Sequence, residues 1–386
     1  MPSKRKKVTL LFLVNDPSYF VTHRLCLAKA TLGLGYDVHV AVPFTESNIT
    51  NRKDLALIQQ TGAKLHDWKM HRADTAIFGE LRTLRRAWQV IKRVNPDIMH
   101  SVTIKPVLYG GGIARFRRQR VVFAISGLGH TFIAQGIKAK INRLLIFHAY
   151  RIALFNKFSR TIFQNEDDRT LFYKLNLVPD DQTVLIPGCG VDIDKFHPAP
   201  SPPEGVTTII LPARLQREKG VHEFVAAAEI LAKRGIKARM ALVGYADFDR
   251  PGGIDRAQLE QWCSHEMVEW WGHSTDMPAT FRKAHIACLP SYREGFPKVL
   301  VEAAACGLPI VTTDVPGCRD SVRAGETALL VPVRDAQALA DALEELIADA
   351  KQRQTMGKAG RKLVETHYSE AQFIARSLAL YEEVAP

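Results

Sequence analysis

Two glutamates flank a predicted strand-to-helix junction in residues 291–302. The apolar run 286–290 predicts a short buried strand, and Pro297 is expected in the first turn of the following helix. Glu294 then falls in the connecting loop and Glu302 in the second helical turn. The positive end of a helix dipole suits a phosphate, and carboxylates beside it suit sugar hydroxyls. The arrangement predicts a site for a nucleotide-sugar.

A second charged pair follows another predicted strand. The apolar run 208–211 precedes Arg214 and Lys219, which lie on one predicted strand-to-helix loop. The fork of an arginine and the point charge of a lysine can converge on one diphosphate. Taken alone, this spacing would describe only a charged loop; the glutamates further along the chain favour a binding role.

Residues 291–302 contain Glu-Gly-Phe-Pro and a second Glu after seven intervening residues. This pattern resembles the signature of the retaining glycosyltransferases with the GT-B fold, which include sucrose synthases and many bacterial lipopolysaccharide and capsule transferases. The resemblance implies that Glu294 contacts the transferred sugar and that Glu302 holds the ribose of the nucleotide. Arg214 and Lys219 would bind the leaving diphosphate. Further donor-site residues implied by the resemblance are Phe296, Lys298, Val299, Gly244 and His273.

Apolar runs and helical patterns alternate along the 386 residues, which predicts an α/β protein with parallel sheets. A chain of this length exceeds what one hydrophobic core usually supports, so two domains are expected. The resemblance implies GT-B architecture: two Rossmann-like, doubly wound domains facing a cleft. Strands are predicted at 8–14, 38–42, 98–101, 121–125, 161–163 and 184–186, then at 208–211, 240–243, 268–271, 286–289, 310–313 and 329–331.

A proline-rich segment separates the two sets of strands. Four prolines within residues 198–203 disfavour both helix and strand, so residues 191–203 are predicted to be a linker. The Gly-Val-Asp-x3-Phe-x-Pro pattern at its start resembles the hinge of the family. An N-terminal acceptor-binding domain is expected at 1–190 and a nucleotide-sugar-binding domain at 204–367. Residues 368–386 resemble the last helix of the family, which packs back on the first domain.

Basic residues are concentrated in the first half of the chain. Residues 1–200 carry 30 Lys and Arg against 15 Asp and Glu, whereas residues 201–386 carry 22 against 25. Between Ile98 and Asn165 there are eleven basic residues and no acidic one. Such a field predicts an anionic partner: lipid head groups, a diphosphate-linked acceptor or nucleic acid.

Several features bear on the cellular compartment. Residues 141–158 mix apolar and basic side chains, as in a helix on a membrane surface or one packed on the sheet of the first domain, and the two are compatible. The sequence contains no run of eighteen apolar residues, so no transmembrane helix is predicted. The N-terminal residues do not have the pattern of a signal peptide. The six scattered cysteines predict reduced thiols and no metal site. We expect a cytoplasmic protein on the inner face of the cell membrane.

The loop after the predicted strand 121–125 begins with Ser126, where relatives often place a histidine facing the donor sugar. His130 lies four residues further on. Both are candidate catalytic residues, although for His130, as for His23 and His100, a structural role is an equal alternative. Residues 15–24 lack the glycines of a dinucleotide-binding turn. Residues 23–25 (His-Arg-Leu), followed by the segment 35–40, look instead like the branch of the family that elongates undecaprenyl-diphosphate-linked saccharides.

The resemblance thus implies a retaining, metal-independent glycosyltransferase, and we expect no cofactor. Its donor would be a nucleotide diphosphate-sugar, UDP-HexNAc or UDP-hexose, and its acceptor a polyprenyl-diphosphate-linked saccharide in cell-surface glycan synthesis. One alternative is a nucleotide-sugar epimerase of the same architecture, against which the basic first domain argues. Another is a basic nucleic-acid-binding protein. We expect no nucleic-acid partner, because the basic residues show no interleaved stacking platform and the glutamate pair would have no role.

Overall fold

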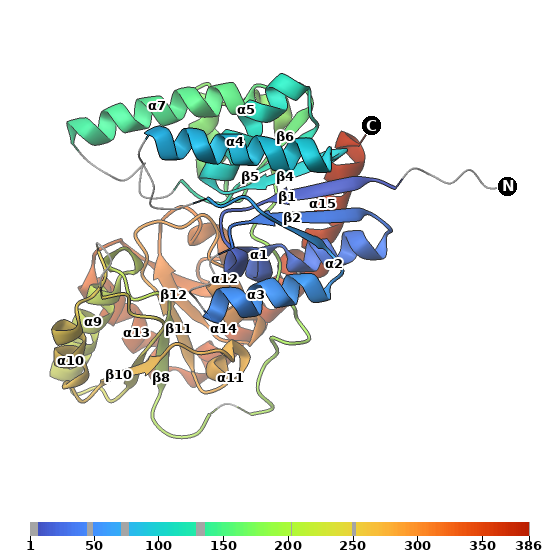
Figure 1. Ribbon diagram of the computed structural model, residues 1–386. Coiled ribbons are helices and arrows are strands. Elements are labelled where there is room, and N and C mark those ends of the chain that lie inside the picture. Colours follow the sequence, from blue (N-terminus) through green and yellow to red (C-terminus); the bar gives the residue numbers. More distant parts are fainter. Residues whose placement is uncertain are drawn as a thin grey trace. The chain divides into compact units, whose positions relative to one another are not determined.

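A computed structural model of the chain describes residues 7–44, 49–70, 77–128, 136–201, 203–248 and 252–385. The chain divides into two compact units (Figure 1). The first comprises Met1–Cys189 together with Phe373–Pro386, and the second comprises Gly190–Gln372. The C-terminal end of the chain therefore belongs to the same unit as its N-terminal half.

In the described part of the first unit, seven parallel strands form one sheet in the order β3-β2-β1-β4-β5-β6-β7. Side chains on both faces of its central strands are buried and, apart from His100 and Ser101 of β4, apolar, as in a sheet with helices on each side. Leu10, for example, pairs with Val38 on one side and Ile98 on the other. The strands are β1 (Thr9–Leu13), β2 (Asp37–Val42), β3 (Lys64–Asp67), β4 (Ile98–Val102), β5 (Val121–Ile125), β6 (Ser159–Phe163) and β7 (Thr183–Leu185).

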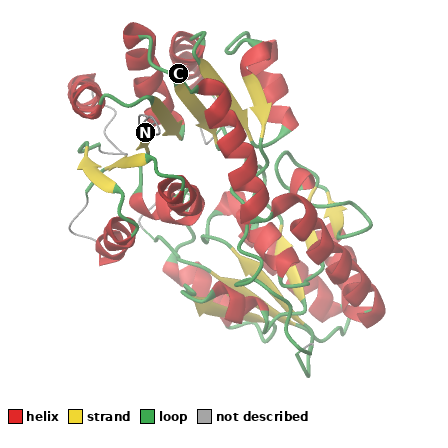
Figure 2. Ribbon diagram, turned by 90° about the vertical axis from the view of Figure 1, so that its right-hand side faces the viewer, coloured by secondary structure: helices red, strands yellow, loops and turns green. Residues whose placement is uncertain are grey.

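Helices cover both faces of this sheet (Figures 1 and 2). One face packs with Phe20, Leu27 and Tyr381, and the other with Ala87, Val107 and Tyr150. The helices of the first face are α1 (Pro17–His23), α2 (Leu25–Gly33), α3 (Ile49–Gln60) and α15 (Glu370–Val384). Those of the second face are α4 (Ile77–Val94), α5 (Ile104–Arg117), α7 (Ile137–Leu154) and α8 (Glu166–Lys174).

The second unit repeats this plan. In its described part, six parallel strands lie in the order β10-β9-β8-β11-β12-β13, with apolar cores on both faces. The strands are β8 (Thr208–Pro212), β9 (Arg239–Val243), β10 (Val268–Gly272), β11 (Ile286–Leu289), β12 (Ile310–Thr313) and β13 (Ala328–Val331). The helices are α9 (Val221–Lys233), α10 (Arg256–Cys263), α11 (Met277–Phe281), α12 (Lys298–Ala305), α13 (Ala336–Ala348) and α14 (Ala350–Leu363), followed by a π-helical turn at Val364–Tyr368.

Both sheets reverse their strand order at one point, between β1 and β4 in the first and between β8 and β11 in the second. In open α/β sheets, ligands bind beyond the carboxyl ends of the strands at such a reversal. The loops that follow β8 and β11 are the ones that carry Arg214, Lys219 and Glu294. The topology alone therefore brings these residues to one edge of the second sheet.

The two parallel sheets confirm the predicted fold class, and the predicted strands differ from the observed ones by at most two residues at an end. Strand β3 was not among the predicted strands; it is a short edge strand whose sequence Lys-Leu-His-Asp holds only one apolar residue. Pro297 is the N-cap of α12 and not part of its first turn. No described helix is long and apolar enough to cross a membrane.

Several arginines of the acid-free segment stabilise the fold of the first unit. Arg120 donates to the carbonyls of Val384 and Ala385 at 2.8 and 2.9 Å, so it caps the C-terminal end of α15. Arg117 donates to the side chain of Asn95 at 3.0 Å. The charge of this segment is thus partly used inside the protein, which the sequence analysis did not anticipate.

The proline-rich linker is attached to the second unit. Val191 pairs with Ser369 in an isolated parallel bridge, with Val191 N–H donating to Tyr368 at 2.9 Å. Arg361 of α14 donates to the carbonyls of Ile193 and Phe196 at 3.1 and 2.6 Å. The first part of the linker is therefore held by hydrogen bonds to the C-terminal helices.

Candidate functional site

Two backbone hydrogen bonds hold the loop that carries Arg214 against β9. Ala213 N–H donates to Val243 and Leu215 N–H donates to Tyr245, both at 3.0 Å. The intervening Arg214 is exposed at the carboxyl edge of the sheet. Gly244 permits this approach, because a Cβ there would lie 1.8 Å from the carbonyl oxygen of Ala213. The predicted donor-site residue Gly244 thus sets the path of the Arg214 loop.

The loops after β8 and β11 are joined to each other. Lys219 ends a short 3₁₀ turn (Arg217–Lys219), and Gly220 follows with φ of 73°. A Cβ at Gly220 would lie 2.1 Å from the carbonyl oxygen of Pro290, so a side chain would separate the two loops. Tyr292 N–H donates to the carbonyl of Glu218 at 2.9 Å.

Glu294 lies at the centre of a polar network formed by these loops. Its Oε1 accepts from Lys219 Nζ at 2.5 Å and from Ser291 Oγ at 2.7 Å. The side chains of Lys219 and Glu294 are only 17% and 14% exposed. Ser291 is fully buried, and Gly317 lies so close that a Cβ there would meet the Glu294 carbonyl at 2.5 Å. The carboxylate is therefore fixed in place, while its Oε2 can accept a further hydrogen bond.

The helix that follows Glu294 presents its N-terminal end at the same edge of the sheet. Pro297 is the N-cap of α12, and no side chain caps the first turn. Phe296, directly before it, packs edge-on against Tyr368 with ring centroids 5.2 Å apart, and Val299 is half-buried. The positive end of the α12 dipole thus lies close to Lys298 and to the Glu294 loop.

Glu302 occupies the second turn of α12, as predicted, and is nearly buried. Lys298 Nζ lies 3.7 Å from its Oε1. Burial raises the pKa of the Glu302 carboxyl, and the charges of Lys298 and Lys195 oppose this rise. Glu302 and Glu294 therefore occupy different environments: one carboxylate is buried with cations nearby, and the other is directly paired.

The remaining predicted residues lie elsewhere. His273 follows β10 on the same edge of the second sheet and is exposed. Ser126 belongs to the first unit, in the loop after β5, where it is half-buried. His130 lies outside the described residues. The structure joins Lys219 to Glu294 directly, and it places Arg214 on the loop after β8 and Glu302 on α12 of the same unit.

Two histidines of the first unit occupy structural positions. His100 is fully buried, and its Nδ1 shares a hydrogen bond with Tyr381 Oη at 2.5 Å. Burial lowers the pKa of His100 well below the usual range, and Arg24 adds to this effect, so the ring is neutral. His23 stacks on Tyr19 with centroids 4.1 Å apart. Both support the structural alternative for these residues.

Sequence reasoning missed two neighbours of the glutamates. Ser291 donates to Glu294 from three positions earlier, a spacing that could have indicated a loop hydrogen bond. The positive charge of Lys195, which lies in the linker, opposes the rise in the pKa of Glu302. Nothing in the spacing of Lys195 and Glu302 could have indicated this, because their proximity arises from the attachment of the linker to the second unit.

The arrangement suits an anionic ligand that also carries hydroxyl groups. Arg214, Lys219 and the start of α12 supply positive charge, while Glu294 and Glu302 supply hydrogen-bond acceptors. Among the described residues, no group of three or more His, Cys, Asp or Glu side chains is placed to hold a metal ion.

Comparison with known families gives two matches that follow each other along the chain. Residues 9–165 match the family described as glycosyl transferase 4-like, and residues 192–363 match glycosyl transferases group 1. The first match covers strands β1 to β6 of the first sheet, and the second match covers all six strands of the second sheet.

Individual proteins agree with this result. The N,N'-diacetylbacillosaminyl-diphospho-undecaprenol alpha-1,3-N-acetylgalactosaminyltransferase of Campylobacter jejuni is 28% identical over 97% of this chain and 98% of its own length. Sucrose-phosphate synthase from Thermosynechococcus elongatus has a similar fold, with a TM-score of 0.80, 20% identity, and 98% and 99% of the two chains covered. Anabaena HepE, solved with UDP and glucose, has a TM-score of 0.79 at 17% identity, covering 97% of this chain and 100% of its own. Since the family matches extend over both units and the fold agrees along nearly the whole chain, the protein belongs to the GT-B glycosyltransferases of the group 1 and 4-like families.

Proposed function

We propose that this glycosyltransferase moves a sugar from UDP-HexNAc or UDP-hexose to a polyprenyl-diphosphate-linked saccharide, with retention of configuration, in cell-surface glycan synthesis. The observation that carries the proposal is the Lys219–Glu294–Ser291 network beside the start of α12, with Glu302 in the next turn. The UDP and glucose bound by HepE support the donor. The undecaprenol-linked substrate in the name of the Campylobacter jejuni relative supports the acceptor.

The charges of the site fit a displacement at the anomeric carbon. The acceptor oxygen bonds to that carbon while the bond from carbon to diphosphate oxygen breaks on the same face. The acceptor proton passes to the departing phosphate oxygen. Arg214, Lys219 and the N-terminal end of α12 stabilise the charge that develops on the diphosphate, so the reaction requires no metal ion.

The two glutamates have different tasks in this proposal. Glu294 holds a sugar hydroxyl through Oε2, because both of its observed hydrogen bonds use Oε1. Glu302 accepts hydrogen bonds from the ribose hydroxyls, which requires the carboxylate form. Lys219 both orients Glu294 and contributes charge near the diphosphate.

The proposed reaction can be tested by acceptor-dependent nucleotide release. We expect UDP release from one or more UDP-sugars only when a polyprenyl-diphosphate-linked saccharide is added, at a rate that EDTA does not change. The product should keep the anomeric configuration of the donor, as judged by NMR. Nucleotide turnover without acceptor would favour an epimerase or hydrolase, and loss of activity in EDTA that magnesium restores would overturn the metal-independent route.

Lys219 and Glu294 are expected to act as one unit. Lys219→Ala and Glu294→Gln should each lower kcat/KM by about 100-fold, the usual effect of removing one transition-state group. The double variant should lose far less than the product of the two effects, because each single change already breaks the pair. Lys233→Ala, an exposed lysine at the far end of α9, serves as control. Multiplicative losses would show that the two residues work independently.

Glu302 is expected to make donor binding sensitive to acid. Because its pKa is raised, the Glu302 carboxylate takes up a proton at a higher pH than an ordinary glutamate, whose pKa is about 4.3. Affinity for a UDP-sugar, whose diphosphate diester keeps its charge, should fall as the pH drops through that raised pKa. Calorimetry should show this change in the parent protein. Glu302→Gln should bind about ten- to a hundredfold more weakly, with no dependence on pH in this interval.

The same residue gives a second readout in the absence of nucleotide. Because the pKa is raised by folding, the folded state loses stability as the pH rises from the unfolded to the folded pKa. Glu302→Gln, which cannot ionise, should therefore unfold at a higher temperature than the parent at pH 7. If the parent and Glu302→Gln bound the UDP-sugar equally well at every pH and unfolded at the same temperature, Glu302 would not belong to the donor site.

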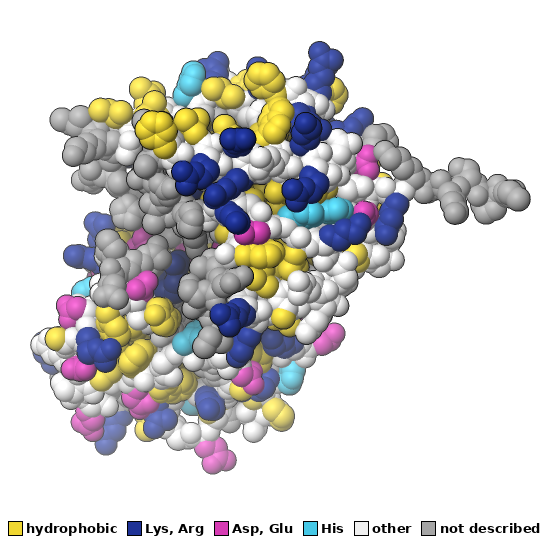
Figure 3. Space-filling view, in the orientation of Figure 1, with side chains coloured by type: hydrophobic (Ala, Val, Ile, Leu, Met, Phe, Trp, Pro, Cys, Tyr) yellow, Lys and Arg dark blue, Asp and Glu magenta, His cyan; other side chains and the backbone are white. Residues whose placement is uncertain are grey.

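We also propose that the first unit binds the anionic inner face of the cell membrane. The outer sides of α4, α5 and α7 expose large apolar side chains, including Phe78 (83%), Phe116 (87%) and Leu144 (69%) (Figure 3). Among them lie the exposed arginines Arg82 and Arg85. On such a surface the apolar side chains can insert at the level of the lipid head groups, and the arginines can bind the negatively charged lipids.

Charge supports this assignment. The three helices contain one acidic residue, Glu80, and it pairs with Lys105 at 2.9 Å. Arg115, Arg117 and Arg120 instead hold backbone or side-chain oxygens of the first unit, so α4 and α7 are better sources of lipid contacts.

Membrane binding can be measured by sedimentation with phosphatidylglycerol vesicles at low and high salt. Each arginine near the surface adds about 1 kcal/mol, so Arg82→Gln/Arg85→Gln should weaken binding by about 30-fold. Leu144→Ser/Leu145→Ser should remove the binding that persists at high salt. The controls are two double variants at exposed positions of the second unit, Lys233→Gln/Lys237→Gln and Val206→Ser/Val333→Ser. Equal sedimentation of all variants would exclude these helices as the lipid-binding surface.

A further inference from the structure

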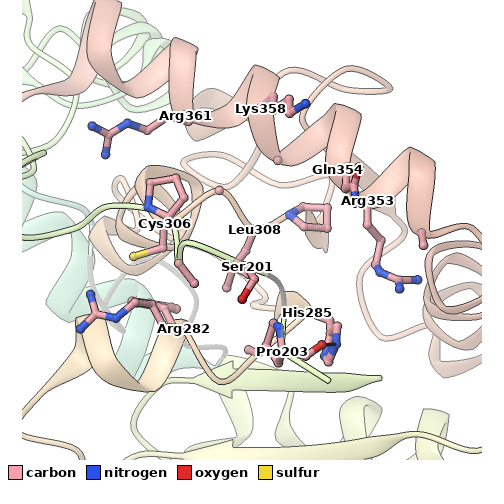
Figure 4. A pocket seen from close by; sticks show the side chains of 18 residues that line it. Ser201, Pro203, Arg282, His285, Cys306, Leu308, Arg353, Gln354, Lys358 and Arg361 are labelled. Carbon is pink, nitrogen blue, oxygen red and sulfur yellow. Dashed lines mark hydrogen bonds between the residues drawn. The ribbon is translucent and has the colours of Figure 1, made fainter. Parts of the chain in front are cut away.

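The two edges of the second sheet differ in how closely their connections pack. At the amino ends of β11 and β12, His285 and Pro309 border a cavity of about 490 Å³ (Figure 4). At the carboxyl edge, the connections after β8 and β11 touch, with Gly220 directly against the carbonyl of Pro290. The carboxyl edge is therefore the one at which neighbouring loops hold each other in place.

The side chain of Tyr292 makes a further contact at this edge. Tyr292 lies two residues before Glu294 in the loop after β11 and is half-buried. Its hydroxyl donates to Glu223 Oε1 at 2.7 Å. Glu223 lies in the first turn of α9, where the positive end of the helix dipole favours a carboxylate. This hydrogen bond ties the loop of Glu294 to the start of α9.

Two side-chain contacts thus join the same two segments of the chain. Lys219 and Glu223 lie four residues apart on the segment that leads into α9, and their partners Glu294 and Tyr292 lie two residues apart on the other. Between these contacts, Tyr292 N–H donates to the Glu218 carbonyl at 2.9 Å. One contact alone lets a loop turn about it, whereas several in a row fix its orientation as well.

A third element holds the ring of Tyr292. Arg334, from the loop after β13, places its guanidinium carbon 4.7 Å from the centre of the ring. A cation over the face of a tyrosine is attracted to it. The side chain therefore contacts both α9 and the β13 loop, although it lies outside the network formed by Lys219, Ser291 and Glu294.

The hydroxyl of Tyr292 acts as a hydrogen-bond donor. Burial raises the pKa of Tyr292, and Glu223 adds to this rise, whereas Arg217 and Arg334 oppose it. The phenol is therefore protonated at neutral pH. A phenylalanine at this position would keep the ring and its contact with Arg334 but would lose the hydrogen bond to Glu223.

We propose that Tyr292 and Glu223 are positioning residues for the transfer reaction, because their hydrogen bond holds the loop that presents Glu294 to the transferred sugar. This inference rests on the proposed function of the site. Neither residue touches the substrate, so their effect passes through Glu294. Since Glu294 contacts the sugar and not the nucleotide in that proposal, a displaced loop slows turnover and leaves the binding of UDP alone unchanged.

Tyr292→Phe removes only the hydroxyl. A catalytic group displaced by about 1 Å can lose about 100-fold in rate, and with the other loop contacts intact we expect kcat to fall about tenfold. The Kd of UDP, measured by calorimetry, should match that of the parent. Glu223→Ala should lose as much, whereas Glu223→Gln should keep most of the activity, because its amide oxygen still accepts from the phenol. Tyr173→Phe, the same change at an exposed position of α8, is the control.

A double variant tests whether Tyr292 acts through Glu294. In a Glu294→Gln background, Tyr292→Phe should change kcat by less than about twofold, because the group that it positions is already altered. A tenfold loss in both backgrounds would show that Tyr292 supports the fold of the whole site and would overturn the positioning role.

Hydrogen–deuterium exchange, followed by mass spectrometry, measures the loop without any reaction. Residues 291–296 should exchange faster in Tyr292→Phe and Glu223→Ala than in the parent, and at the parent rate in Tyr173→Phe. If the parent showed no acceptor-dependent transfer, the proposed function would fail, and exchange would still decide whether the hydrogen bond holds this loop. Exchange in this segment at the parent rate in Tyr292→Phe, or a parent-like kcat beside a slow Glu294→Gln, would overturn the inference alone.

Discussion

The contact between the loops after β8 and β11 is the constraint on which the candidate active site depends. These strands are neighbours at the reversal of strand order, so their loops leave the sheet side by side. Gly220 allows the loops to touch, and the ion pair of Lys219 with Glu294 crosses between them. A buried pair of this kind is costly to form unless further hydrogen bonds complete it, and Ser291 supplies one. The same contact therefore fixes both the cation and the carboxylate.

Much of this arrangement could be predicted because parallel sheets leave a clear sequence pattern. Strands such as β5 are apolar on both faces, and a loop after each strand places Arg214 and Glu294 on one edge. The edge strand β3 could not be found in this way, since it packs one apolar residue. Side-chain partners were harder still. Lys219 pairs with Glu294, and the charge of Lys195 lowers the pKa of Glu302. Both interactions depend on tertiary contacts, which the spacing of these residues along the sequence does not reveal.

The positive charge of the first half of the chain has two distinct uses in the structure. Arg120, directly before β5, donates to carbonyls at the end of α15 and so links the C-terminal helix to the sheet of the first unit. Arg82 and Arg85, in contrast, lie exposed among apolar side chains of α4. The net charge of this half therefore overestimates the number of cations that are available at the surface to bind a partner. The exposed apolar residues, which a charge count ignores, give the better indication of where such a partner would bind.

Helix α12 links the candidate active site to α14, because Glu302 lies in its second turn and Gly307, directly after its C-cap, lies against Gly357 of α14. The helix has only eight residues, and its C-terminal end is held by α14, because a Cβ at Gly357 would lie 2.0 Å from the carbonyl oxygen of Gly307. Inserting one residue would turn one end relative to the other by about 100° and lengthen the helix by about 1.5 Å. The length of α12 is therefore expected to be fixed: related chains can differ in its sequence, but insertions and deletions should be confined to the loops outside it.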